Sequence, residues 1–498
     1  MQLKPKDIGK LFKSAYKAWN DKDPFRQSAV IAYYAIFSIP GLLVLIIAIT
    51  GYFFGKDAVL KLIDEMSRYK FNVFHWHLTD DQGWRLEIKN LRNLTQTGAW
   101  RVPRTGGKFE YLEKPGPGEK ATDGGFYTQK DIIEIVAYAS RHFITVIPEI
   151  DVPAHSLAFI ASYPNISCKQ LPMFVSPGSP LTDSDDNVLC VANDSTYILL
   201  DKIFTEVAEL FPGKYVHIGG DEAAPIFWDS CSKCKKLKDQ FGLKTSADLQ
   251  AYFMQKVSGL LKTKGKDIIG WEEIMHGTLA PGAIVESWTS VVAGIKAARL
   301  KHYVIMSPWD HGFYMDHSKL ETVYNFEPLP VNMDAAYLLG GEACLWTEQV
   351  PTFREAEKHY WPQALVLSEM FWTSAQSKNF SGFQKRMIKS LEYFDKKQIN
   401  YSTRIFDPII TLAGDQAAQK QIAIKSEFDS EVFYYSFDNT EPDHYSSRYT
   451  GEFLRIPKGA TQLKVRGYQD EKPVGKLILK NLAADSLADL RLPDVFDQ

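Results

Sequence analysis

The chain has 498 residues, of which 45% are hydrophobic and 23% charged, and its net charge is −3 at pH 7. These fractions are typical of a globular protein, and the nearly balanced charge argues against a nucleic-acid partner. The length allows two or three domains, or one large barrel with additions.

The first 55 residues differ from the rest of the chain. Residues 1–26 are rich in Lys, and no charged residue occurs from Gln27 to Gly55. The apolar run 36–49 could cross a bilayer, with its basic flank in the cytoplasm. This pattern predicts membrane association through residues 28–55, and it places the remainder at the cell envelope, periplasmic or extracellular. A buried helix or strand is the alternative.

From about residue 57 onward, short apolar runs alternate with amphipathic stretches. The runs that we expect to be strands are 71–77, 143–150, 215–219, 267–271, 283–286, 302–306 and 338–345. The amphipathic stretches between them include 128–142, 195–211, 246–264 and 290–300. Short apolar strands separated by helices predict a parallel sheet that is covered on both faces. We therefore predict an α/β fold, a (β/α)8 TIM barrel whose first strand is replaced or incomplete.

Polar and aromatic residues follow each predicted strand. They are His77, Asp80 and Asp81; Glu149, Asp151 and His155; Asp221 and Glu222; Trp271 and Glu272; Glu286 and Trp288; Asp310, Tyr314 and Asp316; and Trp346 and Glu348. In a parallel barrel the C-terminal strand ends share one face, where active sites are built. We therefore expect these side chains to form one site.

Beyond about residue 399 the helical pattern gives way to alternating segments. The segments 432–437 and 462–468, with a turn at 438–442 after the first, predict an antiparallel, β-sandwich-like domain. The predicted organisation is an N-terminal segment 1–50, a catalytic barrel 51–403 and this small β domain over 415–498.

Asp221 and Glu222 are adjacent at a predicted strand end. Ordinary retaining glycosidases hold two carboxylates about 5–5.5 Å apart across one bond. Neighbouring strand residues start on opposite sides of the chain, so they are poorly placed for that arrangement. A division of labour is favoured instead, in which one residue faces the leaving group and the other holds the substrate. This suits substrate-assisted catalysis, in which the 2-acetamido oxygen of the sugar is the nucleophile.

Four motifs resemble glycoside hydrolase family 20, the β-hexosaminidases. They are Asn72-Val-Phe-His-Trp-His-Leu-Thr-Asp-Asp-Gln-Gly-Trp84, Pro148-Glu-Ile-Asp-Val-Pro-Ala-His155, His217-Ile-Gly-Gly-Asp-Glu222 and Trp346-Thr-Glu348. The resemblance covers about 52–403, and residues 415–480 resemble the small β domain of bacterial members. It implies an exo-acting retaining β-N-acetylhexosaminidase that cleaves terminal β-linked GlcNAc or GalNAc from oligosaccharides or glycoconjugates through an oxazolinium intermediate, without metal or cofactor.

The resemblance also implies roles for individual residues. Glu222 is expected to be the general acid and then the base, with a pKa raised by apolar burial and by Asp221. Asp221 is expected to polarise the acetamido group, and Tyr314 to donate to its oxygen. The implied substrate-binding residues are the walls Trp271, Trp288 and Trp346, the hydroxyl acceptors Asp80, Asp316 and Glu348, and His155, which supports the acid.

The N-terminal part departs from the family. Family members usually carry a small α/β domain before the barrel and an Arg at the end of the first strand, where this chain has Gly51. Residues 28–43 resemble the start of the YihY/BrkB membrane protein family. We therefore interpret the chain as a fusion of two sequences, joined near 51–55. We expect Leu42–Ile49 to fill the missing strand position rather than to span a membrane. The alternatives are an impaired or inactive sugar-binding remnant, and a membrane protein that acts through its N-terminal segment.

The cysteines and histidines do not predict a metal site. Cys231-Ser-Lys-Cys234 is a CxxC motif without a second CxxC, as a zinc site would require. A Cys168–Cys190 disulfide is an option if the barrel is exported. His75 and His77 share one strand face, where packing in the barrel interior is favoured over a metal pair.

Overall fold

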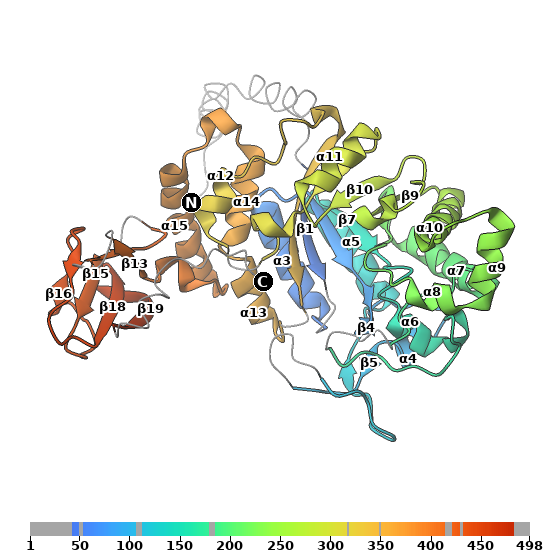
Figure 1. Cartoon of the computed structure of the whole chain (residues 1–498), viewed down its shortest axis with the longest axis horizontal. Coiled ribbons are helices and arrows are strands. Elements are labelled where there is room, and N and C mark those ends of the chain that lie inside the picture. Colours follow the sequence, from blue (N-terminus) through green and yellow to red (C-terminus); the bar gives the residue numbers. More distant parts are fainter. Residues whose placement is uncertain are drawn as a thin grey trace, which may run out of the picture. The chain divides into compact units, whose positions relative to one another are not determined.

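The computed structural model describes residues 53–105, 112–178, 185–315, 318–347, 350–413, 421–428 and 432–482, and the backbone alone of 42–48 and 412–413. These residues form two compact units. The first unit contains the described residues up to Tyr314 together with Glu327–Pro351, and the second contains Met315–Phe326 and the chain from Thr352 onward. Figure 1 labels the elements of both units.

Parallel strands close a barrel in the order β1-β12-β11-β10-β9-β8-β7-β2. The strands are β1 (Leu42–Ala48), β2 (Val73–His77), β7 (Thr145–Glu149), β8 (Tyr215–His217), β9 (Asp267–Trp271), β10 (Ile284–Ser287), β11 (Val304–Met306) and β12 (Leu338–Trp346). Every strand that the apolar runs predicted is present, and the TIM-barrel fold is confirmed. Its interior includes one apolar layer, formed by Val73, Ile147, Ile269, Ile284 and Ile305.

The first strand comes from the unusual N-terminal segment. In β1, Leu42 pairs with Gly340 of β12, and Val44 pairs with Val73 of β2. Both neighbours would otherwise expose unpaired backbone groups, so an apolar, β-branched segment is stabilised there. The expectation that this segment fills the vacant strand position is confirmed. Residues 42–48 thus belong to the sheet, and no helix among the described residues is long and apolar enough to cross a bilayer.

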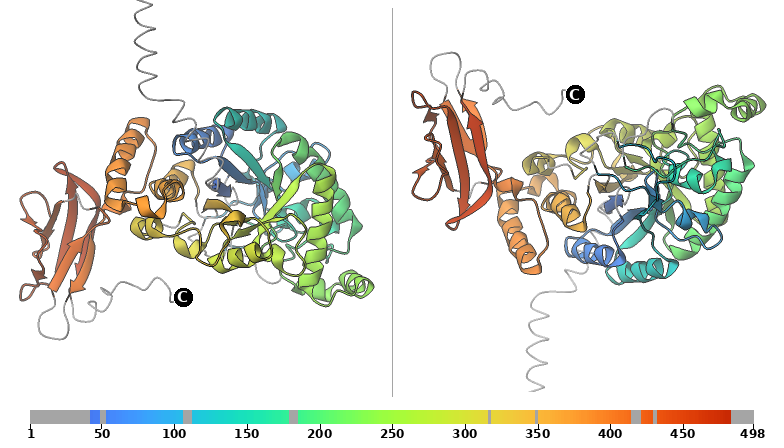
Figure 2. Two further views of the ribbon diagram at one scale, coloured as in Figure 1. Left: turned by 90° about the horizontal axis from the view of Figure 1, so that it is seen from above. Right: turned by 90° about the horizontal axis from the view of Figure 1, so that it is seen from below.

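Helices surround the strands of the barrel unit (Figure 2). The longer ones are α3 (Lys56–Arg68), α5 (Gln129–Arg141), α7 (Asp194–Leu210), α9 (Ser232–Phe241), α10 (Ser246–Thr263) and α11 (Val291–Arg299). Helix α5 begins with a capping box, in which Thr128 and Asp131 satisfy each other's backbone N–H groups. Its buried residues are Ile132, Ile135 and Ala139, whose spacing of three to four residues places them on one face.

Shorter elements form the loops of this unit. They are the strand pairs β3 (Thr79–Asp80) with β4 (Gly83–Trp84) and β5 (Trp100–Arg101) with β6 (Asp123–Gly124); the helices α4 (Asn93–Gln96), α6 (Leu157–Ser162) and α8 (Ile226–Ser230); and the 3₁₀ turns η1 (Pro164–Ile166), η2 (Glu272–Met275), η3 (Trp309–His311) and η4 (Ala335–Tyr337). Several of these elements follow barrel strands at their C-terminal ends, where they position the site residues.

The second unit contains helices and two antiparallel sheets. Its helices are α12 (Leu320–Asn325), α13 (Phe353–Tyr360), α14 (Gln363–Trp372), α15 (Phe380–Lys397), η5 (Ala375–Ser377) and η6 (Thr403–Phe406). One sheet is β13 (Ile409–Ala413), β14 (Gln421–Lys425) and β17 (Leu454–Arg455); the other is β16 (Ser447–Arg448), β15 (Val432–Ser436), β18 (Gln462–Gln469) and β19 (Lys472–Asn481). Residues of both sheets, including Ile422 and Leu463, share one apolar core. The predicted antiparallel domain is confirmed, and its first strand begins before the expected start at 415.

Candidate active site

The acid pair lies in a turn after β8. Gly219 and Gly220 have φ angles of 64° and 99°, in the region that favours glycine. A Cβ atom at Gly219 would lie 1.7 Å from Asp151 Oδ1, so a larger residue does not fit. Glu222 itself has a φ of 48°. Asp221 and Glu222 therefore do not continue an extended strand.

Both acidic side chains approach the same imidazole. His155 Nε2 lies 3.3 Å from Asp221 Oδ2 and 3.5 Å from Glu222 Oε2. The premise that strand geometry sends the two carboxylates to opposite sides is wrong, because the glycine turn redirects them. Their surroundings do differ, since the Asp221 side chain is 14% exposed and the Glu222 side chain 61%.

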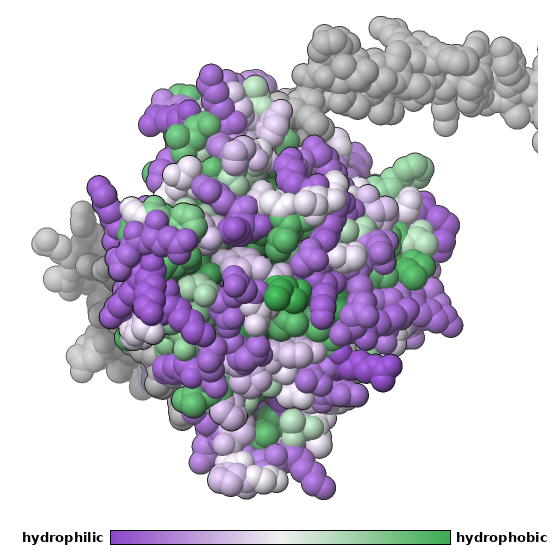
Figure 3. Space-filling view, turned by 90° about the vertical axis from the view of Figure 1, so that its right-hand side faces the viewer, coloured by the Kyte–Doolittle hydropathy of each residue, from purple (hydrophilic) through white to green (hydrophobic). Residues whose placement is uncertain are grey.

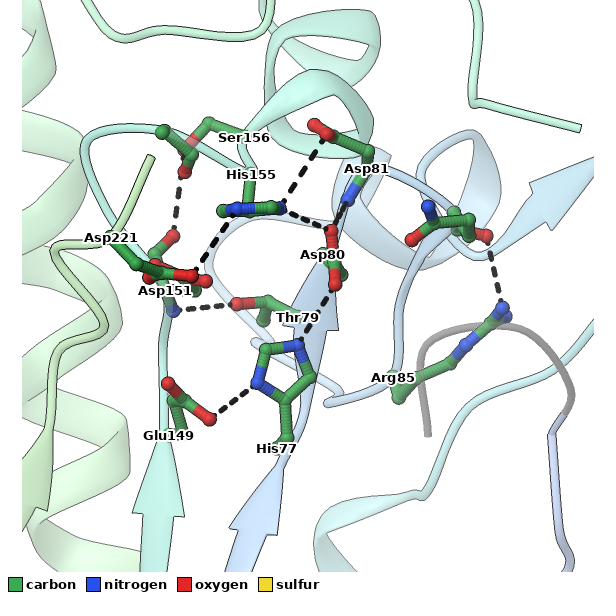
Figure 4. A network of polar contacts seen from close by, with 12 residues as sticks. His77, Thr79, Asp80, Asp81, Arg85, Glu149, Asp151, His155, Ser156 and Asp221 are labelled. Carbon is green, nitrogen blue, oxygen red and sulfur yellow. Dashed lines mark hydrogen bonds and ion pairs between the residues drawn. The ribbon is translucent and has the colours of Figure 1, made fainter. Parts of the chain in front are cut away.

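His155 connects the acid pair to further charged residues, named here the rim network: Asp80, His155, Asp221 and Glu222. His155 Nδ1 lies 3.0 Å from Asp80 Oδ1, and Asp80 Oδ2 lies 3.2 Å from His77 Nε2. His77 Nδ1 in turn contacts Glu149. Figure 4 shows this chain of alternating acidic and imidazole groups. The structure thus brings the predicted Asp80 and His155 to the acid pair.

The carboxylates of the rim network keep His155 protonated. Burial alone would lower the pKa of His155, but Asp80 and Asp221 more than offset this effect and raise it well above its ordinary value. His155 and His77 in turn hold the pKa of Asp80 well below its usual range, against the effect of burial. A cationic His155 at neutral pH therefore lies between the carboxylates of Asp80, Asp221 and Glu222.

This cation reverses the expectation for Glu222. Its ion pair with His155 lowers the pKa of the Glu222 carboxyl, and this effect exceeds the opposing desolvation. The prediction that apolar burial raises this pKa is wrong for the described geometry, because the side chain is largely exposed and faces a positive charge. The neighbour that holds a proton is Asp151, whose pKa is raised well above its usual value by burial and by Asp221.

Aromatic side chains gather at the ends of β9, β10 and β12. Trp271 and Cys344 form a buried cluster against which Trp288, Tyr314 and Trp346 pack. The ring centroid of Tyr314 lies 6.4 Å from that of Trp288, with the two rings nearly parallel, and 6.1 Å from that of Trp346. Burial raises the pKa of Tyr314 well above its ordinary value, so its phenol keeps its proton and can donate it to a hydrogen bond. The three predicted Trp walls and Tyr314 are thus brought together.

Beneath the rim lies a second set of charged groups, named here the interior network: His75, Glu149, His217, Glu286 and Glu342. Their side chains are at most 2% exposed. Glu149 Oε1 lies 2.8 Å from His217 Nδ1 and accepts a hydrogen bond from Trp271 Nε1 at 3.1 Å. His75 Nδ1 lies 2.9 Å from Glu342 Oε1. The placement of His75 and His77 in the barrel interior agrees with the packing interpretation.

The pKa values of Glu149 and Glu286 are shifted in opposite directions. His77, His217 and His75 lower the pKa of Glu149 well below its usual value, despite complete burial. Burial and Glu342 raise the pKa of Glu286 well above its usual value. These shifts follow from the number of imidazoles that face each carboxyl.

Glu273 is a functional candidate that the sequence did not single out. Its carboxylate accepts from Trp288 Nε1 at 3.1 Å and 3.2 Å, and burial with nearby Asp221 raises its pKa to about 7. The adjacent Glu272, which the strand-end pattern selected, accepts instead from the backbone of Trp288 at 3.0 Å. The pattern could not separate two neighbouring Glu residues, because the difference depends on the turn η2.

Some expected positions cannot be placed. Asp316 and Glu348 lie outside the described residues, and so does Gly51.

The cysteines differ from expectation. The structure has all five as free thiols, so the optional Cys168–Cys190 disulfide is not formed. Cys168 and Cys190 instead converge with Cys231 and Cys234. Two separate loops thus supply a second pair of cysteines beside the CxxC pair, which the spacing along the sequence does not reveal.

The family model "Glycosyl hydrolase family 20, catalytic domain" matches residues 46–375. The chain belongs to glycoside hydrolase family 20. The match begins within β1, so the family pattern includes the end of this strand. Asp221, Glu222, His155 and the aromatic cluster all lie inside the matched range.

Relatives and solved structures agree with this assignment. The chain is 36% identical to a β-hexosaminidase of Porphyromonas gingivalis over 422 residues, which is 80% of this chain and 52% of that protein. It is also 36% identical to a β-hexosaminidase of Vibrio furnissii, covering 64% of this chain and 54% of that protein. A family 20 exo-β-N-acetylglucosaminidase from Vibrio harveyi, solved with N-acetylglucosamine, matches with a TM-score of 0.64 and 31% identity over 73% of this chain and 58% of that chain. This chain thus spans little more than half the length of these relatives.

Proposed function

We propose that the protein is an exo-acting retaining β-N-acetylhexosaminidase that removes terminal β-linked GlcNAc or GalNAc from oligosaccharides and glycoconjugates. The observation that carries the proposal is the placement of Asp221 and Glu222 on one protonated imidazole, His155. The β-hexosaminidase relatives and the N-acetylglucosamine complex of the Vibrio harveyi enzyme support the same substrate class.

In the proposed reaction Glu222 protonates the glycosidic oxygen, and the acetamido oxygen of the sugar attacks the anomeric carbon. The C–O bond to the leaving group breaks, and a bicyclic oxazolinium ion forms. Asp221 stabilises the positive charge that develops on the acetamido nitrogen, while Tyr314 donates a hydrogen bond to the acetamido oxygen. Glu222 then removes a proton from a water molecule as the water oxygen attacks the anomeric carbon. The bond between this carbon and the acetamido oxygen breaks, which opens the ring. Two displacements at one carbon retain its configuration.

The charge on His155 favours the first half of this cycle, in which Glu222 acts as an acid. A cation within ion-pair distance stabilises the carboxylate form of Glu222, so proton donation is made easier. The same effect reduces the fraction of Glu222 that is protonated at neutral pH. We therefore expect the activity to be greatest under acidic conditions, where Glu222 still carries its proton.

The remaining residues would hold the sugar. Trp271, Trp288 and Trp346 are proposed to enclose the terminal residue, because aromatic faces pack against the apolar face of a pyranose. Asp80, Asp316 and Glu348 are proposed to accept hydrogen bonds from its hydroxyl groups. His155 is proposed to orient Asp221 and Glu222 through ion pairs, since its ring lies between these two carboxylates and Asp80.

The decisive experiment is turnover of an aryl N-acetyl-β-glucosaminide and of the galactosaminide, with the anomer of the first product followed by NMR. We expect hydrolysis with release of the β-anomer, and tight inhibition by a thiazoline that mimics the oxazolinium ion. Release of the α-anomer, or hydrolysis unaffected by the thiazoline, would contradict the mechanism.

The second candidate is a sugar-binding remnant that is impaired or inactive. It is favoured by Gly51, which stands where the family has an Arg. Loss of a charged hydrogen bond to substrate costs about 1.5–3 kcal/mol, or roughly ten- to hundredfold in kcat/KM. Gly51→Arg should restore that factor. Thiazoline binding without any turnover, in both the natural chain and this variant, would instead favour the remnant.

We also propose that the protein works in the cell envelope, with its YihY/BrkB-like basic segment attached to the membrane surface rather than spanning it. With β1 in the barrel, the uncharged run before it is limited to the 15 residues 27–41, against the roughly 20 residues that a spanning helix requires. Release of the expressed chain from membranes by high salt would support this. Release only by detergent would contradict it and would also argue against the pairing of β1.

A further inference from the structure

Four of the five cysteines meet at one point in the barrel unit. This point lies outside the rim and interior networks, and the cysteines come from three separate parts of the sequence. The sulfur atoms of Cys168, Cys190, Cys231 and Cys234 all lie within 4.8 Å of one another. All four are free thiols, and Cys190 and Cys234 are at most 1% exposed.

Three backbone features build this cluster. Ser167 and Leu189 form an isolated antiparallel bridge, so Cys168 and Cys190, each one residue beyond the bridge, lie on the same face of the two segments. Cys231 is the N-cap of α9, and Cys234 lies in the first turn of that helix. The four sulfur atoms are therefore supplied by two loops and one helix start, and the local backbone fixes all of them.

The distances fit a metal centre and not a disulfide. Cys234 Sγ lies 3.8 Å from Cys168 Sγ and 3.8 Å from Cys190 Sγ. A disulfide requires about 2.05 Å between sulfur atoms. Four sulfurs around a zinc ion, each at about 2.3 Å from it, form a tetrahedron with edges of about 3.8 Å. The two separations from Cys234 Sγ match that edge.

The surroundings suit a negatively charged centre. Four thiolates around a divalent ion leave two net negative charges, and Lys169, Lys233 and Lys235 are sequence neighbours of the ligands. Lys169 Nζ lies over the Phe227 ring at 4.9 Å. The N-terminus of α9 adds backbone N–H groups, which also favour thiolates. The side of the molecule on which α9 is labelled in Figure 1 is predominantly hydrophilic, with small separate apolar patches (Figure 3).

We propose that Cys168, Cys190, Cys231 and Cys234 bind one zinc ion in a structural site. Each thiol releases its proton to solvent as its Zn–S bond forms, and the ion undergoes no redox change. Protein sulfur fills all four tetrahedral positions, so no open position remains for water or substrate. The ion would join the loop that follows β7, which carries His155, to the loop that follows β8, which carries Asp221 and Glu222.

The first test is the metal content of the full chain, purified without chelator and without added metal. We expect about one zinc per chain by elemental analysis, as a closed four-thiolate site requires. Replacement by Co²⁺ should give thiolate-to-metal charge-transfer bands and the visible spectrum of tetrahedral cobalt. Bound iron, four metal-free thiols, or two disulfides in the unreduced chain would each overturn the proposal.

Matched variants locate the site. Cys234→Ser and Cys190→Ser should lose the zinc, whereas Cys344→Ser, at the one cysteine outside the cluster, should keep it. If a cluster variant fails to fold, removal of zinc from the natural chain by a chelator gives the same information. Hydrogen exchange should then accelerate in peptides that span 165–192 and 222–235, and unchanged exchange there would contradict a structural role. Zinc content is measured without substrate, so it stands or falls independently of the hexosaminidase activity.

Discussion

The interior network and the rim network contain the same kinds of group, imidazole and carboxyl, but they differ in exposure. Glu149, His217 and Glu286 are 0% exposed, whereas the Glu222 side chain is 61% exposed. Burial and close neighbours move the pKa of Glu149 well below its usual value and the pKa of Glu286 well above it, and neither group reaches solvent. Glu222 has a smaller shift and reaches solvent, so it can exchange protons. Burial separates groups that hold charge from groups that transfer protons.

The sharpest test of this comparison is Glu222→Gln. Loss of a general acid usually costs about 10²–10⁴-fold in rate. We expect kcat/KM to fall by that factor on a substrate with a poor leaving group. An exposed substitution usually changes the free energy of unfolding by less than about 0.5 kcal/mol, so stability should hardly change. Full activity in the variant would remove Glu222 from the mechanism.

Glu149→Gln, in contrast to Glu222→Gln, should lower the stability of the folded protein. The substitution removes a carboxylate that faces His75, His77 and His217, and it leaves buried imidazolium charge without its partner. Breaking a buried ion pair costs about 3–5 kcal/mol, so we expect a loss of that size in urea unfolding at pH 7.

The matched control for this variant is Glu113→Gln. Glu113 is an exposed carboxylate in the same unit, and its loss should cost less than about 0.5 kcal/mol. Equal stability losses in the two variants would show that the interior network contributes nothing specific.

The third prediction concerns pH. The carboxylates of Glu149 and Asp80 outweigh the effect of burial and raise the pKa of His77 to about 10. A raised His pKa contributes stability that is fully present below the unfolded value of about 6.5 and is lost as the pH rises toward 10. We expect the melting temperature to fall across that interval, with a loss on the order of 2–4 kcal/mol. A constant melting temperature from pH 6.5 to 10 would contradict a charged His77.

The smallest effect is expected for His155→Gln, which removes the cation that faces Glu222. The pKa of Glu222 should rise toward its ordinary value, so the alkaline limb of the kcat profile should move to higher pH. We also expect kcat/KM to fall about tenfold, equivalent to about 1.4 kcal/mol of positioning. His142→Gln, at the end of α5 and away from the site, is the control. An unmoved limb would show that His155 does not set the proton affinity of Glu222.

The sequence predicted features that depend on periodicity and on strand ends. The barrel strands alternate with helices, and their C-terminal ends must share one face, so the meeting of His155, Asp221 and Trp271 could be predicted. The orientation of Glu222 could not be predicted in the same way. It depends on the left-handed turn at Gly219 and Gly220, which an extended-strand argument ignores.

The cysteine cluster shows a second limit of the sequence. Cys168 and Cys190 are 22 positions apart, and their approach depends on the bridge between Ser167 and Leu189. No local spacing encodes that bridge, so a motif search finds Cys231 and Cys234 alone. The filling of the first strand position could be predicted, because an open barrel leaves unpaired backbone groups that any apolar strand can satisfy.

The pairing of β1 has a consequence for how such a barrel can evolve. Backbone hydrogen bonds to β2 and β12 make few demands on the strand they enclose, beyond an apolar segment of the right length. A foreign segment can therefore enter by recombination in a single event and leave a foldable molecule. The pairing does not depend on the residue that follows the strand. The architecture of such a barrel and the side chains at its rim can therefore change separately, because a point mutation at the rim leaves the backbone pairing intact.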